Sequence, residues 1–148
     1  MPAIETTSYA LTCSVASAFD DAVADVTAAL AAEGFGILTT IDVQATLKAK
    51  LDLTVAPYTI LGACNPQLAR RGLAIEPDLG VLLPCNVVVR REGDRTIIAA
   101  MEPLAAMALA GNPELEPIAT EARDRLQRAI AGMADRPRVA QPSAGEAA

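Results

Sequence analysis

Residues 81–101 read VLLPCNVVVRREGDRTIIAAM. Two runs rich in β-branched residues, 81–90 and 96–101, flank the polar segment 91–95, which contains a glycine. Such runs on either side of a short Gly-containing segment are typical of a β-hairpin. Pro84 cannot donate a backbone hydrogen bond, so we expect it at a sheet edge or a bulge. This hairpin predicts an antiparallel sheet, to which the rest of the chain must be fitted.

The N-terminal part of the chain predicts a strand followed by a helix. Residues 9–15 are rich in Thr, Val and small apolar residues, as expected of a strand. Ser17 and Asp20 then form a Ser-x-x-Asp helix start, and Gly34 provides the stop. Between these ends, apolar residues recur at helical spacing and form one stripe: Phe19, Val23, Val26 and Leu30.

Two further strands and two further helices are expected before the hairpin. Residues 35–41 are apolar and β-branched, which predicts a strand that enters the core. Asp42 is placed to cap a short helix, and residues 58–63 predict the next strand. The Asn-Pro pair at 65–66 then predicts a capped helix start, with Gly72 as the helix end.

After the hairpin the chain predicts helices. Pro103 opens a small helix, and an apolar stripe predicts a long final helix. Pro117 lies too deep for the first turn of a helix that starts at Asn112, which predicts either a kink or a later helix start near Glu116. The stripe comprises Leu115, Ile118, Ala122, Leu126, Ala129 and Met133.

These elements predict one α+β domain. We expect a mainly antiparallel sheet with one face covered by the first and last helices. The domain spans residues 1–135, and residues 136–148, rich in Pro, Ser, Gly and Ala, predict a disordered tail.

Composition and charge exclude several functional classes. The chain has 148 residues, 52% of them hydrophobic, and a net charge of −6. A phosphate backbone or an anionic membrane would be repelled, so we expect no nucleic-acid or membrane partner. The absence of His excludes histidine zinc sites, Ser/His/Asp triads and Cys/His dyads within this chain. Three cysteines and no basic N-terminal segment favour a cytoplasmic protein with free thiols.

Two Cys-Asn pairs are the candidate functional residues: Cys64 with Asn65, and Cys85 with Asn86. Cys64 precedes a helix start, where a positive dipole lowers the pKa of a thiol and favours anions. The simpler interpretation is that both cysteines are small buried hydrophobes, and that Asn65 is only a helix cap. Asn86 lies within an apolar strand, so we expect it to be buried and to hold a loop or face a ligand.

The order of several segments resembles the bacterial and archaeal family called domain of unknown function 302. The resemblance covers about residues 8–133 and implies an α+β domain similar to the TATA-binding-protein-like fold, often a homodimer, without implying DNA binding. It implies no activity, and Pro117 departs from the helix-forming residue usual in the family. The segments that carry it are EGFGILT (33–39), IDV (41–43), LK (47–48), ILGACNP (60–66), GVLLPCNV (80–87) and GNPEL (111–115).

Three functional hypotheses follow. The first is a homodimeric module that binds a small ligand near Cys64, Asn65, Cys85 and Asn86, with an anion as one candidate. The helix starts at Asn65 and Asn112 offer amide groups for such a ligand, and a dimer of a small domain forms clefts at its interface. The second is a redox or soft-metal protein that uses the thiols of Cys64 and Cys85 and binds an ion such as Cu(I). The third is an interaction domain without small-molecule chemistry. No pattern identifies a reaction, a cofactor or a conventional metal site, so catalysis stays undecided.

Overall fold

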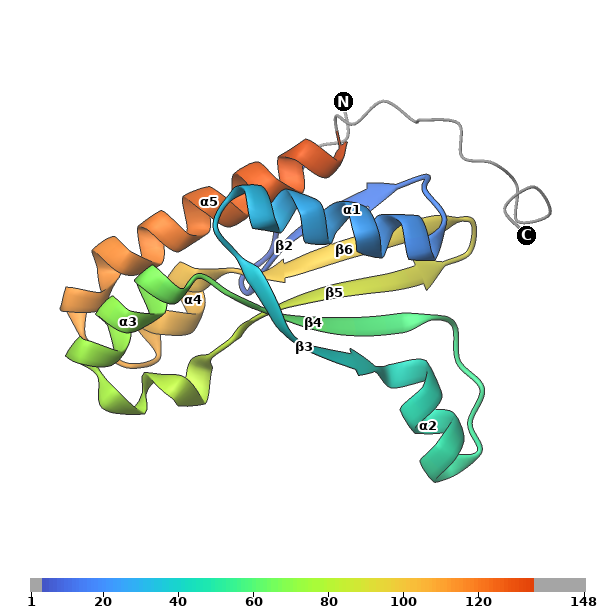
Figure 1. Cartoon of the computed structure of the whole chain (residues 1–148), viewed down its shortest axis with the longest axis horizontal. Coiled ribbons are helices and arrows are strands. Elements are labelled where there is room, and N and C mark those ends of the chain that lie inside the picture. Colours follow the sequence, from blue (N-terminus) through green and yellow to red (C-terminus); the bar gives the residue numbers. More distant parts are fainter. Residues whose placement is uncertain (1–3, 135–148) are drawn as a thin grey trace.

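The computed structural model describes residues 4–134. It contains a six-stranded antiparallel sheet in the order β1-β2-β6-β5-β4-β3 (Figure 1). The strands are β1 (Glu5–Thr6), β2 (Ala10–Val15), β3 (Gly36–Asp42), β4 (Tyr58–Cys64), β5 (Cys85–Glu92) and β6 (Arg95–Met101). The helices are α1 (Phe19–Ala32), α2 (Val43–Leu51), α3 (Pro66–Ile75), α4 (Pro103–Ala108) and α5 (Glu116–Ala134), with short 3-10 turns η1 (Pro77–Leu82) and η2 (Pro113–Leu115).

The first and last long helices cover one face of the sheet, as the sequence predicted. The α1 and α5 helices pack side by side over the strands (Figure 1). Alternating residues of β2, β5 and β6 point into this layer and are buried, among them Leu11, Val87 and Ile98. The predicted stripe on the last helix is buried along its whole length. The α+β class and the antiparallel sheet are therefore confirmed.

The hairpin is present, but its first strand is shorter than predicted. Residues 77–82 form η1, and β5 begins only at Cys85. Pro84 lies just before the strand and is neither within a ladder nor at a bulge, and its peptide bond with Leu83 is cis. Leu79 of η1 is buried against α3, and this packing outweighs the local β preference of residues 81–83.

The strand predicted at 35–41 is an exposed edge strand, and the expectation that it enters the core is wrong. Phe35, just before the strand, is buried and Ile37 is half-buried, but the other six of the seven residues of β3 are exposed. The β3 strand pairs only with β4, and neither α1 nor α5 covers its outer part (Figure 1). Asp42 caps α2 as predicted, since its Oδ1 accepts the amide of Ala45 at 2.9 Å.

Two predicted helix boundaries are shifted. The N-cap of α1 is Ala18, because the carbonyl of Ser17 accepts a hydrogen bond at 2.8 Å from Thr96 Oγ1 and is held by the sheet. Gly72 lies inside α3, where a Cβ would come within 2.6 Å of the Leu79 side chain. Its role is close packing, and the helix ends at Ile75. The start of α5 at Glu116 is as predicted.

A second, smaller core lies at one end of the sheet, between α3, η1, α4 and α5. Its buried residues are Leu68, Leu79, Met107, Leu115, Ile118, Ala119 and Ala122. The described elements thus share one sheet and two adjoining cores. The tail predicted at residues 136–148 lies outside the described residues. Within residues 4–134, no helix is long and apolar enough to cross a membrane.

Candidate functional site

The structure brings together three of the four candidate residues. Cys64 ends β4 and Cys85 begins β5, and the sheet register sets Ala63 directly opposite Cys85. Cys64, Asn65 and Cys85 line one cavity with a volume of about 20 Å³. This space holds about one water molecule, so the cavity as it stands is too small for an organic ligand.

Asn86 does not join this cavity. It lies opposite Gly62 in the β4–β5 ladder and is exposed. Side chains alternate along a strand, so a buried Cys85 on the helix side puts Asn86 on the other face. The prediction of a buried Asn86 is wrong because that face of the sheet carries no helix.

Asn65 is a buried helix cap. Its Oδ1 accepts the amide of Leu68 at 3.2 Å at the start of α3. Its Nδ2 lies so close to Gly34 that a Cβ there would come within 2.9 Å of it. Because Gly34 has a φ of +85°, the left-handed turn after α1 and the cap of α3 are packed against each other. This arrangement supports the structural interpretation of Asn65.

Burial keeps the thiols protonated at neutral pH. It raises the pKa of the Cys64 thiol above its usual value of 9.0, against the expectation that the α3 dipole lowers it. For Cys85, burial and a smaller repulsion from Cys64 raise the pKa to about 11. All three cysteines are free. Neither Cys64 nor Cys85 therefore has the low pKa of an activated nucleophile.

The described residues offer no conventional metal centre. Nowhere in residues 4–134 do three or more Cys, Asp or Glu side chains come close enough to hold an ion. Buried side-chain nitrogen and oxygen atoms in this part of the chain all have hydrogen-bond partners. No buried polar side-chain atom in these residues therefore needs a hydrogen bond from a cofactor.

A larger pocket, which the sequence did not indicate, lies where α4 and η2 meet α5. Its volume is about 320 Å³, within the range of small-molecule sites. The sequence signals here were the small helix that begins at Pro103 and the helix start at Asn112, which predicted free amide groups but not a hollow between two helices. The lining residues are mostly apolar: Leu104, Met107, Ala108, Gly111, Asn112, Pro113, Leu115, Glu116 and Ala119.

Met107 is shared by the two cavities. Its buried side chain lines both the α4–α5 pocket and the small cavity at Cys64 and Cys85. On α5, Ala119 lines the first cavity and Ala122 the second, one helical turn apart. Methionine is unbranched and adapts its shape readily. A rotation of this one side chain would change the shape of both cavities.

The position of α4 depends on a buried carboxylate that the sequence analysis also missed. Glu102 accepts hydrogen bonds from the amides of Leu104 and Ala105 at 3.4 and 2.7 Å. Glutamate is not among the preferred capping residues, so no sequence rule singled it out. The one sequence feature that pointed to Glu102 was its position just before Pro103, the predicted start of a helix.

A shallow groove crosses the helix-free face of the sheet. It has a volume of about 690 Å³ and is lined by residues of β1, β2, β4, β5 and β6. Val88, Ile97 and Ala99 are its apolar members in the centre of the sheet. Polar and charged residues line the rest, including Glu5, Tyr58, Arg90, Glu92 and Arg95.

Comparisons with known proteins assign the chain to a family. Residues 11–133 match the domain of unknown function DUF302. A solved structure, an uncharacterized conserved DUF302 protein from Bacillus stearothermophilus, is similar at 30% sequence identity with a TM-score of 0.78. The match covers 82% of this chain and 95% of that one. No curated protein matches the sequence. With its family match and its shared fold, the chain belongs to the DUF302 family.

Proposed function

We propose that this protein is a homodimeric module that binds a small, largely apolar ligand in the α4–α5 pocket. The observation that carries the proposal is the 320 Å³ volume of that pocket, beside only about 20 Å³ at Cys64 and Cys85. Ligand sites are concave, mostly apolar and equipped with a few polar groups. Here Asn112 and Glu116 are the polar groups and the remaining lining is apolar or glycine.

Charge at this pocket disfavours an anion. Glu116 lines it, and Asn112 donates a hydrogen bond at 3.0 Å to Glu76 Oε1. The other end of the Asn112 side chain accepts the amide of Glu114, so the η2 start is already capped. An anion would meet carboxylates and a satisfied cap. We therefore propose a neutral or cationic ligand, in place of the anion considered from the sequence.

Three of the four residues identified from the sequence keep a part in this proposal through Met107. A ligand that turns Met107 aside joins the α4–α5 pocket to the cavity of Cys64, Asn65 and Cys85. Asn86 faces away from both. A ligand site that extends past Met107 in this way reaches Cys64 and needs no reactive thiol.

The second candidate is a thiol-based redox or Cu(I)-binding protein. One observation favours it: Cys64 and Cys85 line the same cavity. Against it, burial raises the pKa of both thiols, and metal binding requires thiolates. The ligand-binding proposal is therefore preferred.

A thermal-shift screen with matched small molecules tests the ligand proposal. The probes are indole, a primary amine of similar size and the corresponding carboxylate, each with the full chain. We expect the neutral compound and the amine to raise Tm and the carboxylate to have no effect. At 100 times its dissociation constant a ligand stabilises the folded state by about 2.7 kcal/mol.

Two tryptophan variants locate the site. Ala108 is exposed and lines the pocket, so Ala108→Trp should fill the pocket mouth and abolish the shift. Ala110 is equally exposed and does not line it, so Ala110→Trp should bind like the natural chain. Equal binding by both variants would place the ligand elsewhere.

A further inference from the structure

The segment that contains α2 projects from the body of the protein. It leaves the sheet at the end of β3, beyond the layer formed by α1 and α5 (Figure 1). None of the nine residues of α2 is buried. Leu51 and Leu53, at its end, are 67% and 48% exposed. A projecting helix with exposed leucines is typical of an interaction surface.

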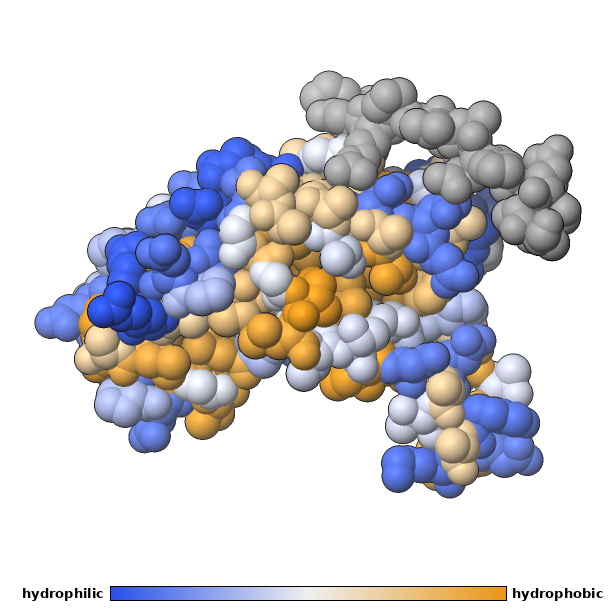
Figure 2. Space-filling model, viewed as in Figure 1, coloured by the Kyte–Doolittle hydropathy of each residue, from blue (hydrophilic) through white to orange (hydrophobic). Residues whose placement is uncertain are grey.

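The helix-free face of the sheet is also unpartnered and carries an apolar row. Ile41, Ile60, Val88 and Ala99 stand opposite one another on successive strands from β3 to β6. Ile41 is 48% exposed, and Leu38 beside it on the same strand is 66% exposed. Figure 2 shows hydrophobic surface along β3 between α1 and α2.

We infer that this face and α2 together form the interface with a second copy of the chain. The inference rests on the homodimer in the proposed function and adds its interface. The strand order places β6 and β5 at the centre of the sheet. We place a two-fold axis parallel to the strands, over the boundary between β5 and β6. Rotation about this axis packs the helix-free face of one copy against that of the other. The β3 edge and α2 of each copy then lie over the β1 edge of the other.

Charge and size support a second copy as the occupant. The last turn of α2 carries Lys50 and Lys48, of which Lys48 also pairs with Asp52 of its own chain at 2.6 Å. The groove lining at the β1 edge includes the carboxylate of Glu5. A two-fold interface forms this Lys–Glu pairing twice. The 14 groove-lining residues and the nine residues of α2 together fall within the roughly 20–30 residues per side of a stable interface.

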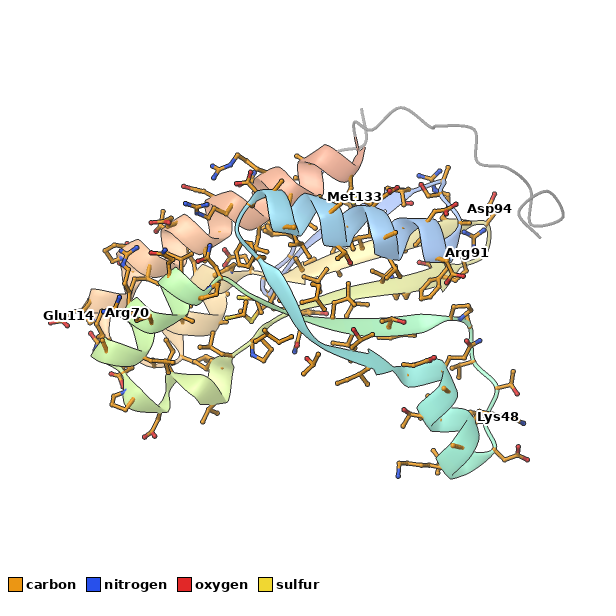
Figure 3. All side chains as sticks on the ribbon, in the orientation of Figure 1. Lys48, Arg70, Arg91, Asp94, Glu114 and Met133 are labelled. Atoms are coloured by element: carbon orange, nitrogen blue, oxygen red, sulfur yellow. The ribbon has the colours of Figure 1, made fainter. Side chains whose placement is uncertain are left out.

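This interface is separate from the proposed ligand pocket. Lys48 on α2 and Glu114 near the start of α5 lie at opposite ends of the molecule (Figure 3). A variant of α2 can therefore change assembly while it leaves the pocket intact. Ligand binding and the position of the dimer interface can therefore be tested separately.

Sedimentation equilibrium with two matched variants tests the interface. At micromolar concentration the natural chain should sediment at twice its chain mass of 15.3 kDa. Leu51→Glu should sediment as a monomer with an unchanged circular dichroism spectrum, because Leu51 is exposed within one copy. Leu109→Glu is the control: Leu109 is 78% exposed and lies outside both the groove and α2, so this variant should stay dimeric.

Chemical cross-linking tests the position of the axis. Ala99 lies on β6 next to β5, on the helix-free face, so the two copies of Ala99→Cys should lie close to the axis, on sheets roughly 10 Å apart. In a Cys64→Ser background, a short bismaleimide that spans this distance should link Ala99→Cys into dimers, whereas Leu109→Cys should stay largely unlinked.

A monomeric natural chain would overturn the dimer itself. A dimer that Leu109→Glu separates and Leu51→Glu does not would overturn this interface alone. Ligand binding by monomeric Leu51→Glu would show that the pocket works without the interface.

Discussion

Glu102 joins α4 to α5 through an ion pair with Arg123, in which Arg123 Nε lies 3.1 Å from Glu102 Oε1. The Glu102 side chain is 9% exposed, and it also caps α4. This pair therefore links two of the elements that line the proposed ligand pocket.

Glu102→Ala should lower the free energy of unfolding by about 2–4 kcal/mol, because it removes a cap and breaks a largely buried ion pair. Urea unfolding measures the change. The control is Glu92→Ala, which removes an exposed ion pair with Arg90 and should cost less than about 1 kcal/mol. Equal losses in the two variants would contradict the role assigned to Glu102.

Gly62→Ala should destabilise the sheet. A Cβ at Gly62 would overlap Thr39 Oγ1 on β3 and come within 2.9 Å of Pro84 Cγ before β5. We expect a loss of about 1–3 kcal/mol, as for other overpacked sites. Gly36→Ala on the neighbouring strand is the control, because nothing lies within 4 Å of its added Cβ. Thermal unfolding of both variants should show a clear drop in Tm for the first alone.

Stability should fall as pH rises through the alkaline range. Burial raises the pKa of Cys13 and of Cys85 from 9.0 to about 11. Between these two values the unfolded chain releases protons that the folded chain retains, so deprotonation favours unfolding. Between pH 9 and pH 11, the ionisation of each of these two thiols lowers the free energy of unfolding by roughly 2–3 kcal/mol.

Cys85→Ala should reduce the slope of stability against pH between pH 9 and 11. Denaturant unfolding at a series of pH values measures it, with Cys64→Ala as the comparison for a less buried thiol. An unchanged slope in Cys85→Ala would show that its thiol is already exposed or ionised in the folded protein.

Alkylation should be slow at all three cysteines at neutral pH. Cys64 should react first, because it is half-buried while Cys13 and Cys85 are buried. Iodoacetamide labelling followed by mass spectrometry gives the order. Rapid labelling of Cys64 at pH 7 would restore the redox or Cu(I) alternative.

Nucleic acids should not bind. The net charge is −6, and the chain has two arginine doublets, Arg70–Arg71 and Arg90–Arg91. Three of these four arginines are engaged within the protein. Arg71 pairs with Glu121, Arg90 pairs with Glu92, and Arg91 donates to the Ser17 carbonyl. Fluorescence anisotropy with labelled duplex and single-stranded DNA at about 0.15 M salt should therefore show no micromolar binding.

The sequence by itself determined the elements that depend on neighbours within a few residues. Asp42 and Asn65 were recognisable as caps because their side chains bond amides three residues away. The stripe from Leu115 to Met133 was recognisable because helical spacing alone puts it on one face. The hairpin, the α+β class and the family followed from such local patterns and their order.

Only the tertiary structure decided which strand faces are covered and where hollows remain. Asn86 and Cys85 are adjacent in the chain, yet the first faces solvent and the second the core, because α1 and α5 cover a single face. The pocket lies where α4 and η2 meet α5, and the ion pair that links α4 to α5 joins Glu102 and Arg123, 21 positions apart in the chain. The pKa of Cys64 likewise follows its burial by residues distant in the chain, which outweighs the dipole of the adjacent helix.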